Sequence, residues 1–318
     1  MDYALGAFAG LLIGDAAGAT LEFHGRRITE DTARRAMTMP GGGMLSVGPG
    51  QITDDGELAL ALASVLAKKD PKNGYPEDDV YKAYHNWYKS VPFDMGATCK
   101  LAFKKSVSKI NHSLPRVQFS QANGALMRIL PLAIWAHNED YETIANLAMK
   151  DSCLSHPNQV CQDANAVYCI AIAYLINNPK DSHGCINVVK TYIDNNITSS
   201  VREWFYESMN DIHHAQNNIG HVKWAFLMAF YHLKWSSTYE DAIFQTLSKG
   251  GDTDTNAAIV GGIIGALHGI EGIPQYMYQP VMNFDCTRLH TAMGQTRPEI
   301  YRASNYKFFV KTVFANMV

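Results

Sequence analysis

Apolar residues recur along most of this chain at helical spacing, and convincing alternating strands are almost absent. Residues 57–67 read Glu-Leu-Ala-Leu-Ala-Leu-Ala-Ser-Val-Leu-Ala, a run of strong helix formers. The pattern predicts an all-α fold. Further helices are predicted over residues 80–90, 124–137, 141–149, 159–176, 186–195, 222–233 and 239–247.

Two segments carry a glycine at every fourth position, which would leave a bare ridge along one face of a helix. They are Gly6, Gly10, Gly14 and Gly18 near the start of the chain, and Gly261, Gly265 and Gly269 near its end. Each glycine costs ~1 kcal/mol of helix stability against alanine, and close packing of two backbones is the compensation that such ridges allow. We therefore expect two core helices in tight contact. Asp15 and Glu22 would lie near the end of the first, and Asp252 and Asp254 at the start of the second.

Composition and charge narrow the class of protein. The 318 residues are 47% hydrophobic and 18% charged, which is ordinary for a soluble globular protein. A net charge of −3 argues against a nucleic-acid partner. The apolar stretch at residues 3–13 has no basic segment before it and is too short to span a bilayer. The six cysteines form no Cys-x-x-Cys pair. We expect a monomeric cytoplasmic protein with free thiols and no membrane contact.

Two short acidic motifs, Thr53-Asp54-Asp55 and Asp252-Thr253-Asp254-Thr255, lie far apart in the chain. Each gathers carboxylate and hydroxyl oxygens, the ligands that Mg²⁺ and Mn²⁺ prefer. If the fold brings the motifs together, they would form one site for two metal ions that activate a water, within a single domain over residues 1–318. The first motif could instead only cap the helix that follows it, although one acid would be enough for that. The glycine-rich loop at 38–52 leads into Thr53, and loops of this length are often functional.

Three further features carry weaker signals. Asn123-Gly124 precedes the predicted helix at 124–137, where free backbone N–H groups would make an anion site, although such a pair is usually only a cap. Arg128 is expected to form a structural ion pair, and Pro131 to kink this helix. His156, in Ser155-His156-Pro157 at the head of another helix, is by itself more typical of a capping or core residue than of a ligand.

The order of these motifs is more specific than any one of them, and it resembles the ADP-ribosylglycohydrolase family. The sequence runs through Gly-Asp-Ala-x-Gly with Glu22 after it, Gly-Gln-x-Thr-Asp-Asp, Asn-Gly-Ala-x-Met-Arg, Ser-His-Pro, Gly-Gly-Asp-Thr-Asp-Thr and finally Arg297-Pro298. Gly41-Gly-Gly-Met and the segment at 92–99 look most like the dinitrogenase-reductase-activating branch, which removes ADP-ribose from arginine. The resemblance covers most of the chain.

The resemblance implies a compact orthogonal multi-helix bundle with a binuclear Mg²⁺ or Mn²⁺ centre. The matching metal ligands are Thr53, Asp54, Asp55, Asp252, Asp254 and Thr255. Glu22 matches a glutamate close to the metals that acts as a ligand or gate, and Asp94 matches a position suggested as acid or base in the arginine-specific branch. From their chemistry, Asp54, Asp254 or Glu22 could accept or relay a proton. Asn123 and Gly124 would lie near the diphosphate, and His156 near the ribose that bears the scissile bond. One position departs from the family pattern: Gly56 stands where a threonine is usual, which should loosen the helix start without removing a ligand.

The predicted function is hydrolysis of the bond between ADP-ribose and a modified protein, with arginine favoured as the modified residue. The reaction passes through an oxocarbenium-like state and normally requires carboxylates. Serine-linked or small-molecule ADP-ribose conjugates are alternative substrates. A two-metal phosphoester hydrolase and a non-catalytic ADP-ribose-binding or structural member of the fold are alternative functions. The intact set of carboxylates favours an enzyme, because clustered acids without a role repel one another.

Overall fold

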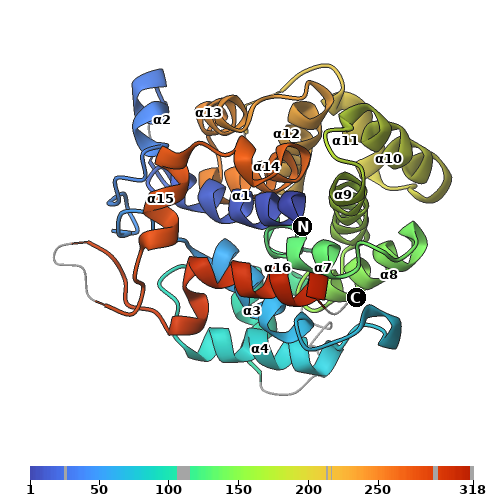
Figure 1. The fold of residues 1–318 in the computed structure, drawn as a ribbon, viewed down its shortest axis with the longest axis horizontal. Coiled ribbons are helices and arrows are strands. Elements are labelled where there is room, and N and C mark those ends of the chain that lie inside the picture. The colour runs from blue at the N-terminus through green and yellow to red at the C-terminus, as the bar shows by residue number, and fades with distance from the viewer. Residues whose placement is uncertain (25–26, 106–114, 213, 216, 289–292, 316–318) are drawn as a thin grey trace.

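The computed structural model is built from helices and the loops that join them, and it describes residues 1–24, 27–105, 115–212, 214–215, 217–288 and 293–315 (Figure 1). Within these ranges no β-strand occurs, and the only strand-like pairings are isolated bridges between Gly42 and Val47 and between Ala122 and His221. The predicted all-α fold is confirmed.

The α-helices are α1 (Asp2–Gly18), α2 (Glu30–Ala36), α3 (Asp54–Leu66), α4 (Glu77–Lys89), α5 (Ala97–Phe103), α6 (Pro115–Gln118), α7 (Leu130–Trp135), α8 (Tyr141–Cys153), α9 (Gln159–Asn177), α10 (Ser182–Asn196), α11 (Ser200–Ser208), α12 (Val222–Lys234), α13 (Tyr239–Lys249), α14 (Thr253–His268), α15 (Gln275–Asn283) and α16 (Tyr306–Ala315). Short 3₁₀ turns are η1 (Pro71–Asn73), η2 (Leu126–Arg128), η3 (Ile270–Gly272), η4 (Glu299–Tyr301) and η5 (Ala303–Asn305).

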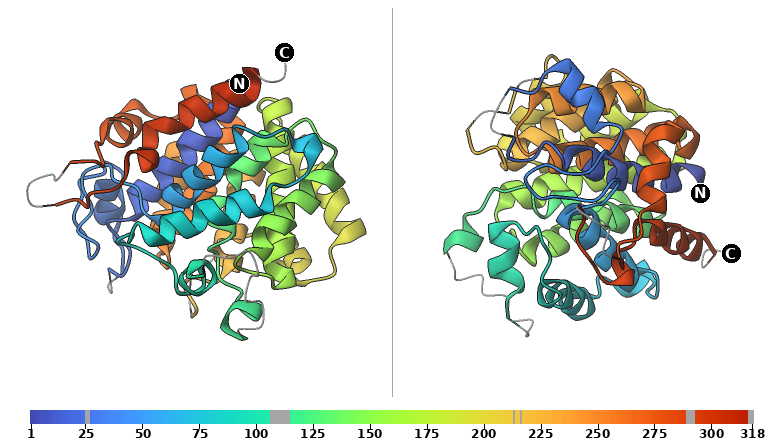
Figure 2. Two further views of the ribbon diagram at one scale, coloured as in Figure 1. Left: turned by 90° about the horizontal axis from the view of Figure 1, so that it is seen from below. Right: turned by 90° about the vertical axis from the view of Figure 1, so that its left-hand side faces the viewer.

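Helices α1 and α14 form the centre of the fold and run antiparallel along their small-residue faces (Figures 1 and 2). Gly6 lies against Gly265, Gly10 against Gly261, Gly14 against Ala257 and Gly18 against Thr253. A methyl group on any of these glycines of α1 would run into the backbone of α14. The predicted close contact is therefore confirmed, and each step of four residues along α1 matches a step of four in the opposite direction along α14.

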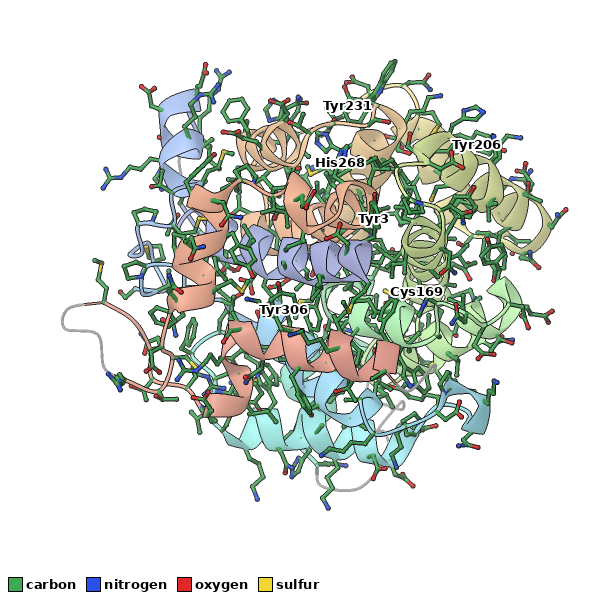
Figure 3. The ribbon with its side chains drawn as sticks, in the orientation of Figure 1. Tyr3, Cys169, Tyr206, Tyr231, His268 and Tyr306 are labelled. Carbon is green, nitrogen blue, oxygen red and sulfur yellow. The ribbon has the colours of Figure 1, made fainter. Side chains whose placement is uncertain are left out.

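The other helices surround this pair. Helices α12 and α13 pack on α14, while α3, α7 and α16 pack on α1 (Figure 2). Tyr306 of α16 points into the core, where its ring meets the edge of Phe8 at a centroid distance of 5.8 Å (Figure 3). All six cysteines are free, and five of them are buried. Over the described residues, the search for a helix both long and apolar enough to cross a membrane finds none.

Two details of the predicted helices are wrong. Gly269 is not part of α14 but ends the helix at φ +74°, a conformation that glycine adopts without strain, although its backbone still packs against Gly6. The helix expected over 124–137 is divided into η2 and α7. Pro131 lies in the first turn of α7, where its missing N–H has no partner to lose, so it starts a helix rather than kinking one.

Candidate active site

The first acidic motif opens α3. Thr53 is the residue before the helix, and Asp54 and Asp55 lie inside its first turn rather than ahead of it. Neither carboxylate caps the helix. That role belongs to Asp15 of α1, which accepts hydrogen bonds from Thr53 N at 3.0 Å, Thr53 Oγ1 at 2.7 Å and Gly56 N at 2.9 Å. Because Asp15 satisfies these donors, Asp54 and Asp55 are not needed as caps: Asp54 Oδ2 accepts from Gly96 N at 3.1 Å, and Asp55 Oδ1 has no partner among the described residues.

Gly56 is buried beside Asp15 in this arrangement. An added Cβ would lie 2.8 Å from Asp15 Oδ2 and 2.9 Å from both Ile52 Cδ1 and Leu12 Cδ2, so the carboxylate and two apolar side chains occupy the space that a threonine would need. The helix starts two residues earlier, at Asp54. The absence of a side chain at Gly56 therefore leaves no empty space, because the Asp15 carboxylate lies close to the helix start there.

The second acidic motif opens α14. Asp252 immediately precedes the helix without capping it, and its Oδ2 accepts a hydrogen bond from Asn123 Nδ2 at 2.8 Å. Asp254 Oδ2 lies 3.5 Å from Thr53 Oγ1, and Thr255 Oγ1 lies 3.5 Å from Asp55 Oδ2. The antiparallel packing of α1 and α14 therefore brings both motifs to one end of the central helix pair, beside Asp15.

The carboxylates converge as a metal centre requires. Oxygens of Asp15, Asp55 and Asp254 lie within 4.8 Å of one another, and so do oxygens of Glu22, Asp252 and Asp254. Asp55 Oδ1 and Glu22 Oε2 are buried, with no hydrogen-bond partner among the described residues. Oxygen-only donors with unused lone pairs fit Mg²⁺ or Mn²⁺ better than zinc, which takes nitrogen or sulfur ligands in most protein sites.

The electrostatics of the cluster also favour a metal site. Burial raises the pKa of Asp15 to about 7 and that of Glu22 to about 8, and the negative charge of Asp94 contributes to both shifts. Burial and then neighbouring carboxylates raise the pKa values of Asp54, Asp55 and Asp254 well above their usual range. The group could not be fully ionised at neutral pH without positive charge among its members, and a divalent cation supplies such charge.

A pocket of about 350 Å³ opens over this cluster. Glu22, Asp54, Asp94, Asp252 and Asp254 line its acidic side, and the described lining contains no lysine or arginine. Asp94 is partly exposed, and burial with the charge of Asp252 raises its pKa. The pocket thus gathers nearly all the predicted site residues, including Asn123, Gly124, His156 and Thr255, while Thr53 and Asp55 lie buried beneath it.

Asn123 and Gly124 do not form the predicted helix-terminal anion site, because the following turn, η2, is only three residues long. Asn123 instead orients Asp252. Gly124 faces Cys99 and His156: a Cβ on it would lie 3.0 Å from Cys99 Sγ and 3.0 Å from His156 Cε1. The glycine therefore keeps the imidazole edge of His156 uncovered. Arg128 forms the expected buried ion pair, with Asp151 at 3.1 Å.

Two hollows adjoin the acidic pocket around Ile219, which lines all three. The first is uncharged at neutral pH and lies between the exposed ring of Phe119 and His221, whose pKa burial lowers. The second is lined by Arg27 and Lys249 and by no carboxylate among its described residues. A ligand in the acidic pocket can therefore extend toward either an uncharged or a basic surface.

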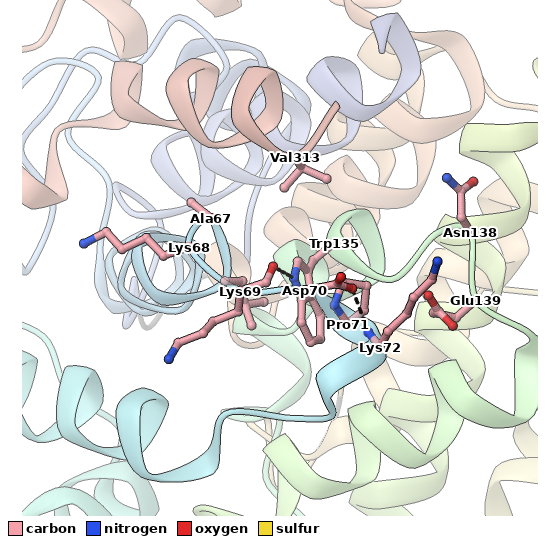
Figure 4. Close-up of a pocket in the computed structure, with 11 residues that line it drawn as sticks. Ala67, Lys68, Lys69, Asp70, Pro71, Lys72, Trp135, Asn138, Glu139 and Val313 are labelled. Carbon is pink, nitrogen blue, oxygen red and sulfur yellow. Dashed lines mark hydrogen bonds between the residues drawn. The ribbon is translucent and has the colours of Figure 1, made fainter. Parts of the chain in front are cut away.

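A larger cavity of about 480 Å³ lies at the C-terminal end of α3, beside Trp135 (Figure 4). Its lining mixes Lys68 and Lys72 with Asp70 and Glu139, and none of the predicted site residues lines it. Trp135 Nε1 donates to the Lys69 carbonyl at 2.8 Å within this cavity. This cavity and the hollow beside Phe119, of about 560 Å³, both exceed the acidic pocket in volume, but the converging carboxylates favour the acidic pocket as the functional site.

Asp15 was not among the site residues predicted from sequence. Its signal was a carboxylate next to Gly14, at the end of the apolar run that follows Asp2 and Tyr3, where the side chain is buried. Arg297 is a second residue near the site that was not among the predicted site residues. Its guanidinium pairs with both oxygens of Glu57 on α3 at 2.7 and 2.8 Å, so the C-terminal segment anchors the helix that carries Asp54 and Asp55.

Comparison with known proteins gives a consistent result. A family model described as ADP-ribosylglycohydrolase matches residues 1–304. The ADP-ribosyl-[dinitrogen reductase] glycohydrolase of Rhodospirillum rubrum is 32% identical over 277 residues, covering 86% of this chain and 88% of that protein. The ADP-ribosylarginine hydrolase Tri1 of Serratia proteamaculans is 28% identical over 286 residues, covering 86% and 74%. A solved chain of an ADP-ribosylglycohydrolase-related protein complex shares the fold, with a TM-score of 0.74 at 20% identity over 100% of this chain and 98% of that one.

Proposed function

The chain belongs to the ADP-ribosylglycohydrolase family of hydrolases, and from this premise we propose that it cleaves the glycosidic bond between ADP-ribose and a modified arginine side chain, releasing ADP-ribose. The observation that carries the proposal is the convergence of two clusters of three carboxylates each at a pocket whose described lining contains no lysine or arginine. An acidic wall of this kind attracts a guanidinium group more strongly than a neutral hydroxyl. The relatives named for arginine chemistry support the same substrate.

Two divalent cations, Mg²⁺ or Mn²⁺, belong to this proposal. Their ligands would be Thr53, Asp54, Asp55, Asp252, Asp254 and Thr255. Asp15 is better assigned a positioning role, because backbone and hydroxyl donors already occupy both of its oxygens. When bound at such a site, divalent cations lower the pKa of a water and bind sugar hydroxyls.

The protein's own groups then divide the remaining work. Glu22 has a buried oxygen free to accept a proton at the pocket wall, Asp254 is its neighbour in the cluster, and Asp54 lines the same pocket. Asp94 lies at the partly exposed side of the pocket, in a position to exchange a proton with the departing guanidine. Asn123 and Gly124, next to the uncharged hollow, would face the diphosphate, and His156 the ribose. These roles are proposals drawn from position and chemistry.

The test is release of free ADP-ribose from arginine-linked and serine-linked protein substrates. Each substrate is assayed with Mg²⁺, with Mn²⁺ and with a chelator. Faster, metal-dependent release from arginine supports the proposal. Faster release from serine, or release that survives chelation, would contradict the substrate or the metal part of it, respectively. No release from either substrate would leave a binding function as the better reading.

A further inference from the structure

His156 presents an unused polar atom to the pocket. The side chain is buried, and its Nε2 has no hydrogen-bond partner among the described residues although the ring lines the acidic pocket. Burial, and next the positive charge of Arg128, lower the pKa of His156 to about 3. The imidazole is therefore neutral at physiological pH, and a neutral imidazole carries one proton on either Nδ1 or Nε2. The nitrogen that carries this proton determines whether His156 presents a hydrogen-bond donor or an acceptor to the pocket.

The other ring nitrogen is held by a chain of buried groups. Arg128 is anchored by Asp151, and its Nη1 donates to Ser155 Oγ at 2.7 Å and to the Gly124 carbonyl at 2.8 Å. Ser155 Oγ lies 2.8 Å from His156 Nδ1. A guanidinium can only donate, so the serine oxygen is the acceptor in the first of these bonds.

The direction of the second bond follows from the serine hydroxyl proton. Ser155 is fully buried, and His156 Nδ1 is the one acceptor recorded for its hydroxyl within the described residues. If Nδ1 carried the proton, the serine would accept twice and its own O–H would be buried without a partner, which costs free energy. If Nδ1 is unprotonated, the serine hydroxyl donates to it and every group of the relay has a partner, and only the imidazole Nε2, which faces the pocket, is left without one. Nδ1 then accepts, and the imidazole proton is on Nε2.

We infer that Asp151, Arg128 and Ser155 form a buried relay that locks His156 in the Nε2–H tautomer, which makes it a fixed hydrogen-bond donor to an oxygen atom of the substrate. Arg128 and Ser155 are positioning residues in this account, since they act only through His156. The missing side chain of Gly124 keeps the donor accessible, because a Cβ there would lie 3.3 Å from Nε2. The part that concerns the substrate rests on the proposed function, whereas the tautomer itself does not.

The tautomer can be measured directly in the full-length protein. Nitrogen-15 shifts of ring-labelled histidine distinguish a protonated from an unprotonated ring nitrogen, and a His156→Asn variant assigns the signal. We expect an unprotonated Nδ1 and a protonated Nε2 from pH 5 to pH 8, without titration. A protonated Nδ1 would overturn the relay, and so would an imidazolium with both nitrogens protonated in this range.

A matched pair of variants separates the relay from simple packing. Ser155→Ala removes the hydroxyl at Nδ1. Ser152→Ala removes an equally buried hydroxyl that donates to the His156 carbonyl at 3.0 Å, so it perturbs the same turn without touching the ring. We expect Ser155→Ala to alter the Nδ1 signal and to lower kcat/KM about tenfold, the cost of one misplaced hydrogen bond. Ser152→Ala should change neither.

The outcomes keep this inference apart from the proposed function. An unchanged nitrogen signal in Ser155→Ala would overturn the relay whatever the activity. A changed signal with an unchanged kcat/KM would retain the tautomer lock but refute the role of His156 as a donor to substrate. If neither arginine-linked nor serine-linked substrate is hydrolysed by the wild type, the nitrogen spectra still decide the tautomer.

Discussion

Gly10→Ala is the sharpest test of the central helix pair, because helix propensity and packing predict opposite signs. An alanine inside a helix is favoured over glycine by ~1 kcal/mol, which by itself would stabilise the protein. In the structure, however, a Cβ on Gly10 would lie 2.9 Å from the carbonyl carbon of Gly261 and even closer to its oxygen, where ordinary contacts begin at 3.4 Å. Backbone atoms cannot rotate away, so α1 and α14 would have to separate by at least half an ångström.

The magnitude follows from these opposing terms. Overpacking a well-packed core costs about 1–3 kcal/mol, and the upper part of that range applies where both partners are backbone. After subtracting the propensity gain, the net loss is about 2 kcal/mol. The unfolding entropy for a chain of this length is about 0.7 kcal/mol/K, so Tm should fall by roughly 3 °C.

Differential scanning calorimetry and urea unfolding of the wild type and Gly10→Ala provide the assay. Gly96→Ala is the control, because a methyl group there meets no atom within 4 Å, and φ is −55°. Its Tm should change by less than that of Gly10→Ala. Gly10→Leu should not fold at all. A Tm for Gly10→Ala at or above the wild-type value would refute the argument that close backbone packing is what compensates the glycines.

Three other predictions concern the site and the pH response. Asp55→Asn or Asp254→Asn should abolish ADP-ribose release and weaken the binding of Mn²⁺ measured by isothermal titration calorimetry. Tm should stay within a few degrees of the wild-type value, because each substitution removes a charge rather than core volume. Near-wild-type turnover would refute the metal assignment. Gly124→Ala should lower kcat/KM about tenfold with little change in Tm, because the added methyl group would cover the imidazole of His156. Unchanged kinetics would show that this edge of the imidazole ring does not contact the substrate. Burial lowers the pKa of His232 to about 4, below its ordinary value of 6.5. Between these two pH values the unfolded chain binds a proton at this histidine and the folded protein does not. The free energy of unfolding should therefore fall as pH drops from about 6.5 to 4, by at most ~3 kcal/mol. Urea unfolding at several pH values should show a shallower fall for His232→Gln, and an identical slope would count against this assignment.

Much of the helical framework could be predicted from the sequence. Long apolar periodic segments such as α9 and α12 begin at the predicted residues, because their periodicity is local and their ends carry clear signals. The helix predicted over 124–137 failed for a tertiary reason. Arg128 is drawn into a buried network with Asp151 and Ser155, and a 3₁₀ turn rather than an α-helix brings it there. Short helices such as α5 and α11 carry too few residues for a periodic signal.

The two acidic motifs and the glycine ridges could be read from the chain alone, because spacing within a few residues determines both which ligands gather and which helix face is bare. What the sequence could not show is the register between α1 and α14, which depends on atoms more than 200 positions apart. That register brings Asp254 next to Thr53, and the packing of α1 on α3 places Asp15 at the start of α3, so that Asp54 and Asp55 are not needed as helix caps. The direction of the hydrogen bond at His156 is likewise tertiary, since it depends on a guanidinium that can only donate reaching a serine buried beside the ring. Residue types and local spacing thus determined which carboxylates, hydroxyls and imidazoles this protein can use, and long-range packing decided which of these groups reach the pocket and which are used to hold the helices together.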